Sequence, residues 1–104
     1  MQQDAGQYDA AEAAYRRSLE IDAQTNNRAG QANTLTALGV LYNNQLNRPE
    51  EAVTFYRQAA DIFVETKDFR SEGVTRNNIA NTLRQLKRYA EARREIMRAI
   101  ECKQ

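Results

Sequence analysis

The fold of this chain is decided by residues 38–59, which have the sequence LGVLYNNQLNRPEEAVTFYRQA. Small and large apolar residues recur in this stretch at helical spacing, and the pattern returns in residues 79–99, IANTLRQLKRYAEARREIMRA. Gly39 is followed by Ala80 after 41 residues. Self-similarity at such a period is typical of stacked helical repeats, whose extended surfaces usually bind other chains.

The small residues of the pattern indicate how the helices pack. Gly39 and Ala52 allow two neighbouring helices to approach closely, and Tyr56 fills the space beside them. The equivalent residues of the second copy are Ala80, Ala92 and Ile96. Half of the pattern also occurs earlier, at Ala11 and Tyr15, so the chain is predicted to contain about two and a half repeats.

Apolar periodicity predicts five helices joined by short turns. We expect them at residues 9–25, 28–46, 49–65, 70–86 and 89–103. Asn and Pro punctuate the turns, and the turn at 43–48 has one residue more than its counterpart in the later copy. The predicted units are residues 1–27, the second helix of a truncated repeat with its turn near Gln7, and two full repeats at 28–67 and 68–104.

Leu38-Gly39-x-x-Tyr42 followed by Ala52-x-x-x-Tyr56-x-x-Ala59 resembles a tetratricopeptide repeat. The later copy is a degenerate version with Ala80 in place of the glycine. The spacing of 40–41 residues is similar to the long-helix variety of these repeats, found in kinesin light chain and many bacterial signalling proteins. The resemblance implies an all-α, right-handed superhelical stack of antiparallel helical hairpins, an α-solenoid.

Residue types that enzymes and metal sites need are scarce. The chain has no His and one Cys, and it shows neither zinc-ligand spacing nor a glycine-rich phosphate loop. We therefore expect no catalysis, no metal and no cofactor. Cys102 is alone, which favours a reducing, cytoplasmic location, and no apolar run is long enough to cross a membrane.

Charge is distributed unevenly along the chain. Residues 1–69 hold six Lys/Arg and ten Asp/Glu, whereas residues 70–104 hold nine and four. The basic residues alternate with Glu, which argues against nucleic acid as a partner. We expect Arg94 and Arg98 to lie on the convex side and to be screened by Glu91 and Glu95. The alternative is that the basic end receives an acidic partner, or the acidic end of a neighbouring copy.

The first helix of each repeat is expected to line a concave groove. The predicted groove residues are Asn33, Thr36, Val40, Asn43, Asn77, Asn81 and Arg84. An Asn amide can pair with both the N–H and the C=O of a bound peptide, and Arg can bind a carboxylate through two hydrogen bonds. The other interpretation of these residues is a solvated surface or hydrogen bonding between helices.

We therefore expect a non-enzymatic scaffold module that binds a protein or peptide in this groove. Two alternatives remain open: a module that stacks copies end to end, and a sensor for a small ligand. Apolar side chains at the ends of the stack would favour association of this chain into homo-oligomers. The candidates are Ala14, Leu19, Ile96 and Ile100.

Overall fold

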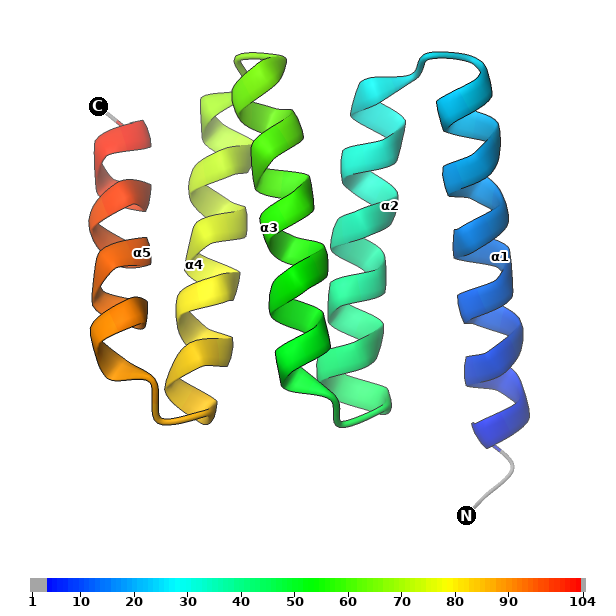
Figure 1. The fold of residues 1–104 in the computed structure, drawn as a ribbon, viewed down its shortest axis with the longest axis horizontal. Coiled ribbons are helices and arrows are strands. Elements are labelled where there is room, and N and C mark those ends of the chain that lie inside the picture. The colour runs from blue at the N-terminus through cyan, green and yellow to red at the C-terminus, as the bar shows by residue number, and fades with distance from the viewer. Residues whose placement is uncertain (1–3, 104) are drawn as a thin grey trace.

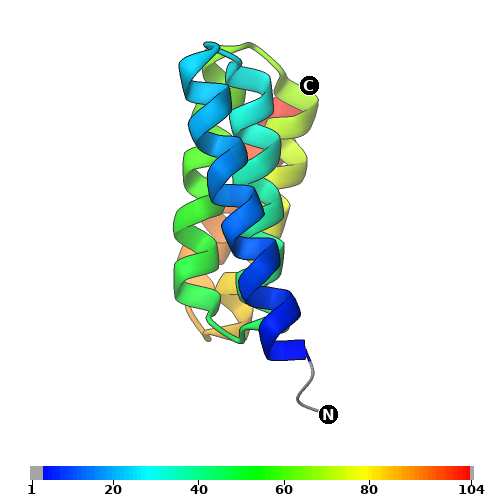
Figure 2. The same ribbon diagram turned by 90° about the vertical axis from the view of Figure 1, so that its right-hand side faces the viewer.

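Five α-helices follow one another as antiparallel neighbours in a computed structural model, and a short π-helix directly continues the second of them (Figure 1). The model describes the backbone of residues 4–103 and the side chains of residues 8–88 and 91–98. The elements are α1 (Asp4–Gln24), α2 (Arg28–Val40), η1 (Leu41–Gln45), α3 (Pro49–Glu65), α4 (Phe69–Gln85) and α5 (Tyr89–Lys103). Seen from the end of the stack, α3 lies on one side and α2 and α4 on the other (Figure 2). The predicted all-α solenoid is confirmed.

Each of the four turns between helices contains one residue with a positive φ angle. Asn26, Asn47, Lys67 and Lys87 have φ angles of 56–62°, the left-handed conformation that commonly ends a helix. The next helices then begin with caps. Asn27 accepts a hydrogen bond from the Gly30 N–H at 3.0 Å, Asp68 caps α4 in the same way, and Pro49 occupies the first turn of α3.

Close packing of small against large residues holds the hairpins together, as the sequence predicts. A Cβ added at Gly39 would lie 2.5 Å from Cε1 of Tyr56, so only glycine fits beneath this ring. Ala52 and Ala92 are also buried, at 0% and 2% exposure, and they belong to the same core cluster. Ile96 packs against this cluster, as its equivalence to Tyr56 predicts, and so does Leu19, although both are also candidates for an exposed end of the stack.

The extra residue between the second and third helices is absorbed inside a helix, which corrects the expectation of a longer turn. The Leu46 N–H bonds the Leu41 carbonyl at 3.1 Å, five residues back, and Leu41–Gln45 forms a π-helix. The Arg48 N–H then bonds Tyr42, six residues back, whereas Arg88 in the later copy bonds five residues back. The wider turn of helix keeps Tyr42 in the core despite the insertion.

The first helix differs from its prediction. It begins at Asp4 rather than near residue 9, and the turn expected at Gln7 is helical. Residues 1–3 lie outside the described residues, as do the side chains of Ile100 and Cys102. Within residues 4–103, no helix combines the length and the apolar character that crossing a bilayer requires.

A buried ionic network joins α3, α4 and α5. The guanidinium of Arg76 donates to Glu72 at 2.8 Å and to Glu95 at 3.2 Å, and Arg57 donates to the other oxygen of Glu95 at 2.8 Å. The side chains of Glu72, Arg76 and Glu95 are all less than 10% exposed. Glu95 therefore points into the stack, so our expectation that it screens the surface arginines of α5 is wrong.

Candidate functional groove

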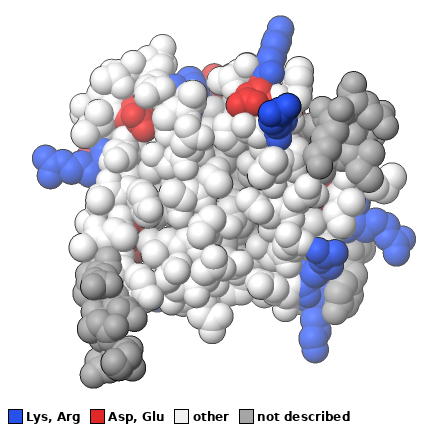
Figure 3. Space-filling view, turned by 180° about the vertical axis from the view of Figure 1, so that it is seen from behind, with Lys and Arg blue, Asp and Glu red and all other residues white. Residues whose placement is uncertain are grey.

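The face formed by α2 and α4 carries few charges. In a space-filling view, the middle of this face is almost free of charged side chains (Figure 3). Residues 29–47, which contain most of α2 and all of η1, include no charged residue. On α4, Glu72 and Arg76 are buried in the ionic network, which leaves Arg70 and Arg84 as its exposed charges. A partner on this face would therefore meet mainly neutral side chains between two cations.

A hollow of about 280 Å³ lies in this face where α2 approaches α4. Its lining consists of Asn33, Thr36, Phe63, Arg70, Ser71, Val74 and Thr75. Phe63 of α3 is 5% exposed and closes the bottom, whereas Val74 is 52% exposed at the rim. The hollow can hold an apolar side chain while the Asn33 amide, which is exposed, offers both a donor and an acceptor to a polypeptide backbone.

The predicted residues on the second helix lie in different places. Asn33 and Thr36 line the hollow, and the Thr36 hydroxyl donates to the Ala32 carbonyl at 2.9 Å. Val40 is 39% exposed but lines a different depression, with Tyr8 and Tyr15 of α1. Asn43 lies in η1, where its amide donates weakly to Asn44 at 3.4 Å. The structure thus brings Asn33 and Thr36 together and leaves Val40 and Asn43 apart from them.

The predicted residues on α4 form one stripe. Asn77 is half-buried, and Asn81 and Arg84 are exposed. The guanidinium of Arg84 donates to the Oδ1 of Asn81, so the two side chains are held against each other. This contact leaves the Asn81 amide N–H and the remaining guanidinium donors available to a partner.

Helical spacing also puts Val74 on the predicted groove side of the fourth helix, together with Asn77. Sequence reasoning missed the other four residues of the hollow, namely Phe63, Arg70, Ser71 and Thr75. Arg70 could have been found, because it lies four residues before Val74 on the stripe that continues to Asn77. Phe63 and Thr75 carry no such signal, since a buried side chain that forms a floor has the same pattern as any other core residue.

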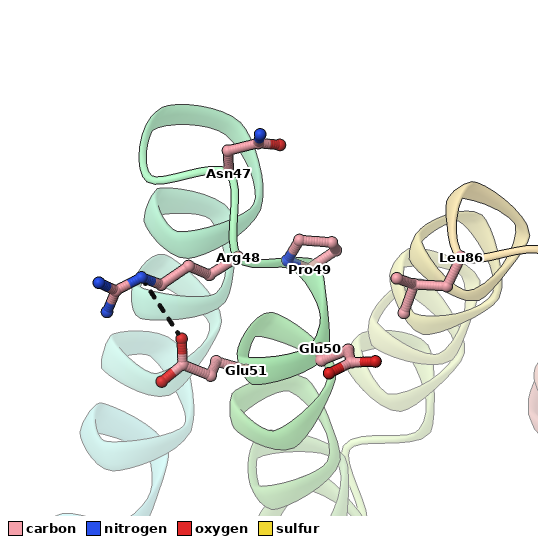
Figure 4. A pocket seen from close by; sticks show the side chains of 6 residues that line it. All are labelled: Asn47, Arg48, Pro49, Glu50, Glu51 and Leu86. Carbon is pink, nitrogen blue, oxygen red and sulfur yellow. Dashed lines mark ion pairs between the residues drawn. The ribbon is translucent and has the colours of Figure 1, made fainter.

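A further hollow, of about 360 Å³, lies at the turn between η1 and α3. Pro49 and Leu86 supply its apolar surface, and Glu50 lies between them. Arg48 and Glu51 also belong to the lining and pair with each other at 3.7 Å (Figure 4). This arrangement offers little apolar area and no fixed donors. In the part of the chain with described side chains, no cluster of His, Cys, Asp or Glu could hold a metal ion.

Comparison with known proteins agrees with this architecture. Two family models described as tetratricopeptide repeat match the chain, one over residues 1–63 and the other over residues 74–104. No curated protein and no solved structure matches it. Repeats of this kind generally mediate protein–protein interaction and scaffolding, typically without enzymatic activity. The matched models together with the stacked helical hairpins show that the chain belongs to the tetratricopeptide repeat family.

Proposed function

We propose that this chain holds a polypeptide segment in the hollowed face of α2 and α4. The observation that carries the proposal is the contrast between this neutral face, with its hollow over Phe63, and the charged outer helices. An apolar side chain of the segment enters beside Val74, and its backbone pairs with the amides of Asn33 and Asn77. An acidic group next to this anchor binds Arg70 or Arg84.

This function fits a reducing, cytoplasmic setting, since the lone Cys102 needs no disulfide partner. It also gives a role to the asparagines of α4. Asn is a poor helix former, about 0.5 kcal/mol worse than Ala per residue. Asn77 and Asn81 on one helix face therefore cost stability, and binding a peptide backbone would explain their presence.

A peptide selection tests the proposal. Peptides are selected from a random displayed library on the wild-type protein, and their dissociation constants are measured by calorimetry. We expect the Asn77/Asn81/Arg84 triple alanine variant and Val74→Asp each to raise the Kd about tenfold or more. The control is Arg17→Ala with Gln24→Ala, two exposed residues of α1. Equal affinities of the groove variants and the wild type would refute groove binding.

A further inference from the structure

A second hollow opens on the opposite, outer side of the stack. It lies between α1 and α3 and has a volume of about 540 Å³. The helix α2, which forms a wall of the inner groove, supplies the floor here through Leu35, and Leu19 and Ile62 add apolar sides. We call this the outer hollow. Leu35 and Ile62 are 5% and 7% exposed and Leu19 is half-buried, so the hollow is a shallow apolar depression over the core.

The rim of the outer hollow is acidic. Glu20 of α1 and Asp61 of α3 lie on its two sides, and both are exposed. Neither forms an ion pair with any residue whose side chain is described. The arginine in the lining, Arg28, is already bound to Glu65 at 2.8 Å. An occupant that carries an apolar side chain between cations would complement this rim.

At the corresponding place in the next repeat, charged residues of the chain pair with one another. Leu35 is replaced by Arg76 after 41 residues, and Gln31 by Glu72. There the Arg76–Glu95–Arg57 chain of ion pairs crosses between α4, α5 and α3 and supplies its own partners. Among the side chains that the structure describes, the outer hollow therefore has apolar residues where the later repeat has a buried ionic pair.

The matching surface lies at the other end of the same chain. Met97 of α5 is 58% exposed, and Arg93, Arg94 and Arg98 are exposed around it. Residues at these spacings share one helix face. Glu95 is turned inward to Arg76, and Glu91 pairs with Arg88 at 2.7 Å, so no close ion pair between described side chains involves these three arginines.

We propose that the outer hollow binds the Met97 face of α5 from a second copy of the chain. Met97 enters between Leu19 and Ile62, where a flexible thioether side chain suits an irregular apolar site. The arginines beside it pair with Glu20 and Asp61. Because donor and acceptor surfaces are different patches, the contact is heterologous and either closes into a ring or dimer or continues as a chain.

Light scattering and sedimentation of the whole chain test this association. Between about 1 µM and 500 µM, the wild type is expected to pass from the mass of one chain to that of two or more. Met97→Glu and the pair Glu20→Lys with Asp61→Lys each raise the association Kd about tenfold or more, since like charges then face each other. Added salt weakens the wild-type association.

Mixing the variants gives the sharpest result. The Met97→Glu protein retains an intact outer hollow, and the Glu20→Lys/Asp61→Lys protein retains an intact α5 face. The mixture therefore forms a heterodimer although each variant alone has the mass of one chain. The control Arg48→Glu changes an exposed cation at the opposite end of the helices and leaves association as in the wild type.

Several outcomes would overturn the proposal. They are a wild type that keeps the mass of one chain throughout the range, variants that associate as the wild type does, or a mixture without heterodimer. Circular dichroism confirms that the variants fold, and Met97→Gln repeats the test with an uncharged side chain. The peptide affinities of the inner groove serve as a separate readout, because neither set of substitutions touches α2 or α4.

Discussion

The two interfaces that pack an outer helix onto the stack occupy equivalent positions in the repeat and have opposite chemistry. At the first, Leu35 and Phe55 are apolar, and the Arg16 guanidinium lies 5.8 Å from the centre of the Phe55 ring. At the second, the residues 41 and 40 positions later are Arg76 and Glu95. Arg57, which corresponds to Arg16, binds Glu95 at 2.8 Å.

This difference separates what fixes the repeat from what varies within it. The small residues at the helix crossings occur at both interfaces and set the distance between helices. The positions between them accept either an apolar pair or an ionic pair, provided that every buried charge has a partner. The equivalent arginines, Arg16 and Arg57, suit either kind of pair, since an arginine can contact an aromatic ring or a carboxylate.

The largest expected loss of stability comes from Arg76→Leu, which gives the second interface the residue that the first has at Leu35. It leaves the carboxylates of Glu72 and Glu95 in the interior without the cation between them. We expect the free energy of unfolding to fall by about 3–5 kcal/mol, measured by urea denaturation. A loss below about 1 kcal/mol would mean that water reaches this site and that the pair is not truly buried.

The matched control converts the whole cluster. Glu72→Gln, Arg76→Leu and Glu95→Phe together reproduce the chemistry of Gln31, Leu35 and Phe55. Because no buried charge is then left unpaired, the triple variant should recover most of the stability that Arg76→Leu loses, and replacing a buried ion pair by apolar residues can even add about 1–4 kcal/mol. A triple variant as unstable as the single one would show that the two interfaces differ in shape as well as in chemistry.

A smaller effect is expected at the helix crossing. Gly39→Ala places a Cβ 2.5 Å from Cε1 of Tyr56, so the ring must shift. Overpacking costs about 1–3 kcal/mol, and the better helix propensity of Ala returns about 1 kcal/mol. We therefore expect the free energy of unfolding to fall by about 0–2 kcal/mol in a urea titration.

The second repeat provides the control for this crossing, because it already combines Ala80 with Ile96. Adding Tyr56→Ile to Gly39→Ala should therefore relieve the clash and make the two changes non-additive. If the double variant loses the full sum of the single effects, the ring of Tyr56 is needed for another reason, such as filling the core beside Ala52.

The repeat architecture could be predicted from the sequence because its determinants are local and recur. The small residues at the crossings and the Asn-containing turns carry their meaning within a few residues. The extra residue before Pro49 was also visible, but its absorption into η1 was not, since a longer turn and a wider helix satisfy the same spacing.

The buried ionic network could not be predicted from local sequence patterns. Glu72 and Arg76 look like an ordinary exposed pair at i, i+4, and their burial depends on where α5 packs. A comparison of the two repeats does contain the signal, since Arg76 falls where Leu35 is core.

For the groove, helical spacing placed Asn33 and Thr36 near α4, whereas the floor at Phe63 required three-dimensional packing. Their role in binding stays a prediction.

The smallest expected effect is on the pH dependence of stability, at Glu12 in the first interface. Hydrogen bonds from the Tyr42 hydroxyl, above all, and from Arg16 lower the pKa of Glu12 below its usual 4.5. The unfolded chain then binds the proton more tightly, so this stabilisation is present above pH 4.5 and is lost as the pH falls through the folded pKa.

Tyr42→Phe removes the hydroxyl and keeps the ring, whose centre lies 4.9 Å from that of Phe55. We expect a loss of about 0.5–1 kcal/mol at neutral pH, small because Glu12 is partly solvated. The fall in stability between about pH 5 and pH 3 should become shallower than in the wild type. The second interface has Val53 at the position equivalent to Glu12. An unchanged pH profile in Tyr42→Phe would assign the lowered pKa of Glu12 to Arg16 instead, which Arg16→Gln would then test.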